Sequence, residues 1–141
     1  MPNHRTTVES IYQAFGRGDM PAIVDKLSPQ VRWEAWHDHF AQRAGLPHLA
    51  VRHGPDGVLA FFNAIGSGYQ FHEFKVLDVI GDGAQSAVEV TVDCTVRATG
   101  RRFFDEELHL WSFDEVGRVS RMRHYVDTAK HLWACAAAAP A

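Results

Sequence analysis

The stretch HLWSFDEVGRVSRMRHYVDT, residues 109–128, contains the ends of two predicted strands and the turn that joins them. On both sides of the turn the side chains alternate between two faces, with the period of two that is typical of β-strands. The turn itself, DEVG, contains the aspartate and glycine that antiparallel connections favour. We therefore expect an antiparallel hairpin in the C-terminal part of the chain.

The rest of the chain supplies predicted helices and further strands around this hairpin. Helices are expected over 6–19, 20–28 and 54–65, a strand over 31–40, a loop or lid over 41–53, and a last helix over 127–139. Long strands are expected over 71–80, 86–99, 101–113 and 118–126. Helices that precede an antiparallel sheet indicate an α+β fold, in which a curved sheet wraps around the helices and leaves a hollow.

Composition indicates a single domain over residues 1–141, with its core over about 5–133 and an Ala-rich C-terminal tail. Hydrophobic residues make up 46% of the chain, which is enough for a real core, and the net charge of −3 argues against nucleic acid or an anionic membrane as partner. We see no signal peptide and no bilayer-spanning run. Cys94 and Cys135 lack metal-ligand spacing, so we expect two free thiols in a cytoplasmic protein.

The strand over 103–113 has an unusual inward face, on which large aromatic residues alternate with ionisable ones. That face carries Phe103, Asp105, Glu107, His109, Trp111 and Phe113. A partly wet pocket explains this mixture, and the alternative is that the rings cover a core edge while the acids reach solvent. On the next strand His124 lies between Met122 and Val126. The apolar face of 88–96 suits either the core or a dimer contact.

Three segments of the chain, VESIYQAFGRGDMPAIVDKLSPQVRWEAW, RHGPDGVLAFFNAI and HLWSFDEVGRVSRMRHYVDT, carry a resemblance to a known fold family. They resemble the SnoaL-like branch of the nuclear transport factor 2-like superfamily, which includes ketosteroid isomerases, epoxide hydrolases, dehydratases and polyketide cyclases. The resemblance implies a cone-shaped α+β barrel with a curved mixed sheet around three N-terminal helices and a central hydrophobic cavity. It also implies a homodimer and no metal or organic cofactor.

Family site residues do not transfer directly onto this sequence. The positions that ketosteroid isomerases use fall at Ile11, Ala35 and His109, with Tyr12 one step from the expected tyrosine. The last strand of related hydrolases and cyclases carries a carboxylate where this chain has His124. Steroid isomerisation and epoxide hydrolysis by the family mechanisms are therefore not expected.

What remains is a pair of histidines on neighbouring strands in an aromatic cavity. We predict His124 and His109 as catalytic acid/base residues. Predicted substrate-binding residues are Tyr12, Trp33, Trp36, Phe61, Phe62, Trp111 and Met122, and further candidates are Glu107, Asp127 and His37. Asp127 also suits the N-cap of the last helix, and structure is favoured over catalysis there. Clustered histidines could ligate zinc, but no HExxH-like signature supports a metal.

Two functions are consistent with this pattern. The first is a cofactor-independent isomerase, cyclase or dehydratase that acts on a hydrophobic carbonyl compound. The second is a non-catalytic domain of the same fold that binds a small apolar molecule or another protein. Imidazoles that contact one another or a cavity water would favour the enzyme, and imidazoles that face bulk solvent would favour the binder.

Overall fold

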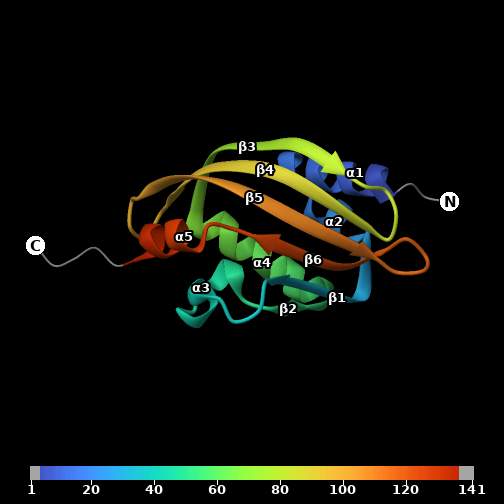
Figure 1. Ribbon diagram of the computed structural model, residues 1–141, viewed down its shortest axis with the longest axis horizontal. Coiled ribbons are helices and arrows are strands. Elements are labelled where there is room, and N and C mark those ends of the chain that lie inside the picture. The colour runs from blue at the N-terminus through green and yellow to red at the C-terminus, as the bar shows by residue number, and fades with distance from the viewer. Residues whose placement is uncertain (1–3, 137–141) are drawn as a thin grey trace, which may run out of the picture.

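The computed structural model of the protein describes residues 4–136, which form a curved mixed sheet with helices on its concave side (Figure 1). The strands are β1 (Leu27–Ala35), β2 (Arg52–His53), β3 (Tyr69–Ile80), β4 (Gln85–Val96), β5 (Arg102–Phe113) and β6 (Val119–Tyr125). The helices are α1 (His4–Arg17), α2 (Met20–Val24), α3 (Phe40–Arg43), the 3₁₀ helix η1 (Pro47–Leu49), α4 (Gly54–Gly68) and α5 (Thr128–Cys135).

The six strands form one sheet in the order β2-β1-β6-β5-β4-β3. Neighbouring strands are antiparallel except for β1 and β6, which pair in parallel and connect the N-terminal and C-terminal parts of the chain. The expected hairpin over 109–128 is confirmed as the end of β5, the turn at Asp114–Gly117 and β6. Thus the α+β cone expected from the sequence is present.

The core lies between the sheet and the three helices α1, α2 and α4. Helix α1 buries Val8, Ile11 and Ala14, and α4 buries Val58, Phe61 and Ile65 against the same cluster. The apolar face of β4, from Val88 to Val96, is at most 6% exposed and belongs to this core. That face therefore packs inside the domain and does not form a dimer contact.

Several expected boundaries differ from the structure. The second helix ends at Val24 rather than at residue 28, because Leu27 already pairs with Val119 as the start of β1. Helix α4 continues through Gly66 to Gly68, since glycine permits helical backbone as readily as it permits a turn. The segment 41–53 is not a plain loop but contains most of α3, η1 and β2. The Ala-rich end of the predicted last helix, 137–139, lies outside the described residues.

Two aspartates cap helices as their positions in the sequence suggest. Asp19 accepts a hydrogen bond from the Ala22 amide at the start of α2, and Asp127 accepts one from the Lys130 amide at the start of α5. Both cysteines are free thiols. In the described part of the chain, no helix has the length and apolar character needed to cross a membrane.

Candidate active site

A cavity opens between helices α1 and α4 and the concave face of the sheet. Aromatic side chains form most of its wall, and its volume is about 100 Å³. Of the predicted substrate-binding residues, six line this cavity: Tyr12, Trp33, Phe61, Phe62, Trp111 and Met122. The rings pack edge to face, for example Trp33 against Trp111 at 5.5 Å between centroids. The cavity is therefore a preformed apolar chamber with a shape that suits ring compounds.

The two predicted catalytic histidines both line this cavity. His109 on β5 and His124 on β6 are direct partners in the strand register, and their ring centroids lie 6.3 Å apart. No hydrogen bond joins the two described rings, so they do not act as a bonded pair. Neither ring faces bulk solvent, because the side chain of His109 is 12% exposed and His124 is 4% exposed.

His109 is held between a tyrosine and a carboxylate. Its Nδ1 lies 2.6 Å from Tyr12 Oη, and its Nε2 lies 3.4 Å from Glu107 Oε1. Burial opposes the charge on Glu107, but hydrogen bonds from His109 and His131 outweigh it and hold the pKa of Glu107 well below its usual value. An ionised carboxylate only accepts, so in the neutral form of His109 the Nε2 carries the proton and the Nδ1 accepts from the Tyr12 hydroxyl.

Tyr12 lines the cavity and belongs to the hydrogen-bonded series that includes His109 and Glu107. Its oxygen accepts a hydrogen bond from Trp111 Nε1 at 3.1 Å while its O–H donates to His109. Burial raises the pKa of Tyr12 well above its usual value, although the bond from Trp111 acts in the opposite direction. The phenol therefore stays protonated in the resting site, with one oxygen lone pair left for another partner.

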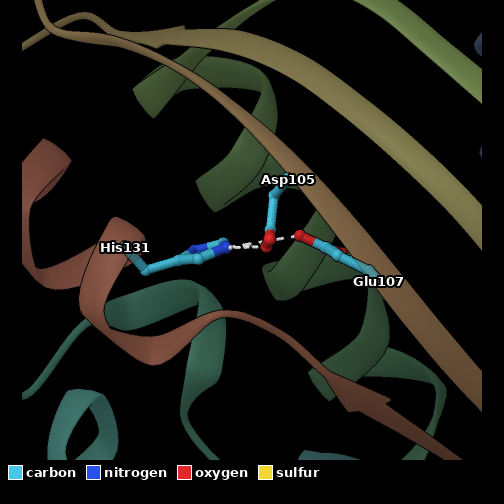
Figure 2. A group of neighbouring side chains, drawn as sticks. All are labelled: Asp105, Glu107 and His131. Carbon is cyan, nitrogen blue, oxygen red and sulfur yellow. Dashed lines mark hydrogen bonds and ion pairs between the residues drawn. The ribbon is translucent and has the colours of Figure 1, made fainter.

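Glu107 has a second partner that the sequence did not suggest, His131 on α5 (Figure 2). His131 Nε2 lies 2.7 Å from Asp105 Oδ2 and 3.3 Å from Glu107 Oε2. Burial alone would lower the pKa of His131, but the two carboxylates raise it to about 9. Burial also raises the pKa of Asp105 above its usual value. The three side chains thus combine two acids with one imidazolium.

A line of hydrogen bonds continues from His131 through η1 to the start of β3 and returns to α5. His131 Nδ1 lies 2.8 Å from His48 Nε2, His48 Nδ1 lies 2.7 Å from Tyr69 Oη, and Tyr69 Oη lies 3.4 Å from Cys135 Sγ. Burial and the charge of His131 lower the pKa of His48 to about 3, so His48 is neutral and accepts from His131. One direction of donation satisfies every group: His131 to His48, His48 to Tyr69, and Tyr69 to Cys135.

His124 differs from every other histidine on the cavity wall. Its Nε2 is buried and has no hydrogen-bond partner. Burial, followed by the proximity of His109, lowers its pKa to about 3. His124 is consequently a neutral imidazole with an unsatisfied polar atom in an apolar chamber, a state that costs free energy unless a ligand supplies the partner.

Asp105, Glu107 and His131 also present three ligand atoms within 4.8 Å of one another, a spacing that could hold a metal ion. Metal ligation requires an imidazole nitrogen without its proton. Here Nε2 of His131 donates its proton to the carboxylates, so a cation would have to displace a proton held by two acids.

Comparison with known proteins places the chain in a family. The sequence profile of the SnoaL-like domain matches residues 8–122. The chain belongs to the SnoaL-like family. No curated protein sequence matches it significantly.

Solved structures similar to this SnoaL-like domain agree on the fold. A nuclear transport factor 2-like protein of unknown function from Burkholderia pseudomallei is 27% identical, with a TM-score of 0.79 over 97% of this chain and 100% of that one. A similar protein from Burkholderia thailandensis is 22% identical, with a TM-score of 0.82 over 96% and 99%. A candidate polyketide cyclase from Pseudomonas putida is 20% identical, with a TM-score of 0.72 over 96% and 100%.

Three predicted site residues of the SnoaL-like domain lie elsewhere. Trp36 stacks on Tyr125 with ring centroids 5.6 Å apart and does not line the cavity, because it follows the end of β1. His37 is exposed, and Asp127 is exposed at the start of α5, where it caps the helix. Among the described residues, no hydrogen bond or ion pair joins Asp127 to Arg123. The contact that Asp127 makes with its carboxylate is the cap of α5.

The hydrogen-bonded residues that extend from Glu107 through His131 to Tyr69 form a polar network. The sequence did not indicate that Asp105 is a buried acid of this network, or that His48, Tyr69 and His131 belong to it. One signal was available, since two acids on the inward face of β5 need partners if they are buried. The sequence did not indicate which of nine histidines would provide them. His48 comes from η1 and His131 from α5, so only the packing of these elements brings them to β5.

Proposed function

We propose that this SnoaL-like domain is an acid/base enzyme that removes and returns a proton next to the carbonyl group of a hydrophobic ring compound. The observation that carries the proposal is the bonded series Tyr12–His109–Glu107 in the wall of an otherwise apolar cavity. An oriented base with a carboxylate behind it is the arrangement that general acid/base catalysis uses. Isomerisation, cyclisation and dehydration all begin with such a transfer.

The proton path follows from the hydrogen-bond directions. The bound substrate gives its carbon-bound proton to the free lone pair of Tyr12 Oη, while the Tyr12 hydroxyl passes its own proton to His109 Nδ1. The substrate becomes an enolate, His109 becomes an imidazolium, and the negative charge of Glu107 offsets the new positive charge. Reversal of the two transfers returns a proton to a different substrate atom.

His124 suits a different role from His109. With a pKa of about 3, the imidazole of His124 is a weak base, and its protonated form is scarcely populated at neutral pH. It is therefore suited neither to remove a proton nor to return one. A neutral imidazole can still donate an N–H to the carbonyl oxygen of the substrate, where enolate charge develops. The unpartnered Nε2 of His124 is the atom that we assign to this contact.

The comparisons support the class of reaction but not a substrate. Two structures with this fold, from Pseudomonas putida and Rhodopseudomonas palustris, are named as a candidate polyketide cyclase and a candidate isomerase. Cyclases and isomerases both move protons next to carbonyl groups, as proposed here. The same fold also hosts proteins that only bind ligands, so the experiment below must separate binding from turnover.

We also propose that the domain forms a homodimer through the convex side of the sheet. Phe104 on β5 is 50% exposed on that side, and Leu77 of β3 is 54% exposed. Large exposed apolar side chains favour contact with another protein surface. Light scattering during size-exclusion chromatography measures the mass directly, and a monomer at micromolar concentration would contradict this proposal.

Proton abstraction can be measured without knowledge of the natural substrate. The protein is incubated in D₂O with 2-acetylnaphthalene and other neutral aromatic methyl ketones, and loss of the methyl proton signal is followed by NMR. We expect exchange above the buffer rate for at least one ketone, with Tyr12→Phe and His109→Gln slower by ~10²–10⁴-fold. Matched controls are Tyr125→Phe and His72→Gln, which change residues outside the cavity lining.

Binding of the ketones without exchange would contradict the enzyme and leave the ligand-binding domain as the function. Exchange that survives in both Tyr12→Phe and His109→Gln would contradict the assigned proton path while keeping the activity.

A further inference from the structure

The cavity wall carries a buried negative charge, that of the Glu107 carboxylate. None of the described residues that line it is a lysine or arginine, and its ionised wall groups are Glu107 and His131. Asp105 lies directly behind them, 1% exposed and bonded to His131. Burial raises the pKa of Asp105, so Glu107 is the carboxylate whose charge faces the chamber. Both ring nitrogens of His131 are already engaged, by the two acids on one side and by His48 on the other, so this imidazolium has no free donor for an anionic ligand.

Nearby arginines do not offset this charge. Arg121 and Arg123 alternate with Met122 and His124 along β6, so they project from the opposite face of the sheet. Arg32 pairs with Glu34, and Arg102 pairs with Asp93 on β4. Of these four arginines, two are therefore paired with an acidic residue and two lie on the convex side of the sheet.

The remaining cavity wall also disfavours an anion. The faces of aromatic rings carry the negative part of their quadrupole, and rings such as Trp33, Phe61 and Trp111 make up most of the surface. A second negative charge brought into such a low-dielectric site would interact repulsively with Glu107 and would lose its hydration without a cation in return. A neutral carbonyl compound is not repelled by Glu107 and does not lose the hydration of a charged group. Its carbonyl oxygen can accept a hydrogen bond from His124.

We propose that the cavity selects its ligand by charge, so that neutral ring compounds bind while the same ring with a carboxylate or phosphate is rejected, and that Glu107 is the residue that sets this preference. The inference rests on the proposed function in taking this cavity as the substrate site. It narrows the substrate class to neutral ketones, quinones and related carbonyl compounds.

Two ligands of nearly identical shape test the proposal by isothermal titration calorimetry at pH 7. In 2-acetylnaphthalene a methyl group occupies the place of the second carboxylate oxygen in 2-naphthoate. We expect the ketone to bind about tenfold or more tightly than the carboxylate, because Glu107 repels the negative charge of the carboxylate. Glu107→Gln removes the charge with little change in shape, and we expect it to reduce this ratio by about tenfold.

Glu106→Gln is the matched control, because Glu106 is the next residue on β5 but is exposed on the opposite face. It removes the same charge from the protein and should leave the ratio unchanged. If Glu107→Gln does not fold, Glu107→Met replaces the carboxylate by an uncharged side chain of similar length. Its fold is checked by circular dichroism.

Equal affinity for the two ligands, tighter binding of the carboxylate, or no binding of either ligand by the wild-type protein would overturn the inference. An equal drop in the ratio with Glu106→Gln would overturn the role of Glu107. Charge selection without proton exchange in D₂O would refute the proposed enzyme alone, and exchange of ketones without charge selection would refute this inference alone.

Discussion

His109 and His124 lie directly opposite one another on β5 and β6, yet one has two hydrogen-bond partners and the other has none at Nε2. His109 bridges Tyr12 and Glu107, which gives it a defined proton position. His124 is buried beside Phe61 without such support, and its pKa falls to about 3. Adjacent positions in one sheet thus hold one imidazole with two hydrogen-bond partners and one imidazole with an unpartnered nitrogen.

Replacement of His124 by leucine should separate function from stability. Leucine has a similar volume and no polar atom, so the free energy of unfolding should stay within about 1 kcal/mol of wild type or rise. Ketone exchange in D₂O should fall by ~10²-fold as the donor to the carbonyl oxygen is lost. Urea denaturation and NMR exchange measure the two effects. A large loss of stability would mean that His124 has a structural role instead.

Removal of the Tyr12 hydroxyl should weaken the fold although the ring remains. Tyr12→Phe leaves His109 Nδ1 and Trp111 Nε1 without their shared partner, which should lower the free energy of unfolding by ~1–3 kcal/mol. Urea denaturation measures this change. Tyr125→Phe, which removes a hydroxyl outside the cavity, should cost less than about 0.5 kcal/mol. Similar losses for the two variants would show that the Tyr12 bonds contribute little.

Loss of His131 should be the most damaging single change in the network. His131→Leu leaves Asp105 and Glu107 as two buried acids without their cation, and breaking such a group typically costs ~3–5 kcal/mol. Addition of Asp105→Asn should recover part of that loss, because one of the unpaired charges is gone. A double-mutant cycle from denaturation curves measures the coupling. Strictly additive effects would contradict the ion pair.

Stability should be highest near neutral pH and fall on both sides. His48 and His124 have pKa values of about 3 in the folded protein against about 6.5 unfolded, so the unfolded chain binds more protons and stability falls as pH drops below 6.5. His131 has a raised pKa of about 9, so its contribution is full below pH 6.5 and is lost as pH rises through 9.

Thermal melts from pH 4 to pH 10 measure this profile. Each buried histidine should add up to about 1.4 kcal/mol per pH unit to the acid limb. The stability of His124→Leu should therefore fall less steeply below pH 6.5 than that of the wild type. Its loss of stability at alkaline pH should be the same as in the wild type. An acid limb that does not change in this variant would show that His124 is already charged or solvated in the folded protein.

The α+β order and the direction of the strand faces were predictable because they depend on local patterns, and the cone shape was implied by the family resemblance. Period-two alternation on β5 and β6 correctly placed Glu107, His109, Trp111 and His124 on the inward side. The extent of α4 and the short elements in 41–53 were not predictable in this way. Whether a glycine continues a helix depends on what its neighbours pack against.

The sequence by itself determined the α+β order and the two faces of β4, β5 and β6, since these follow from side-chain periodicity and turn residues along the chain. The SnoaL-like family was indicated by the resemblance of three segments and is shown by the profile match over residues 8–122. Only the tertiary structure decided which groups share protons. His131 meets Glu107 because α5 folds back onto β5, and His48 meets His131 because η1 packs beneath it. The charge state of each group depends on burial and on partners far away in the sequence, and neither can be read from its neighbours in the chain.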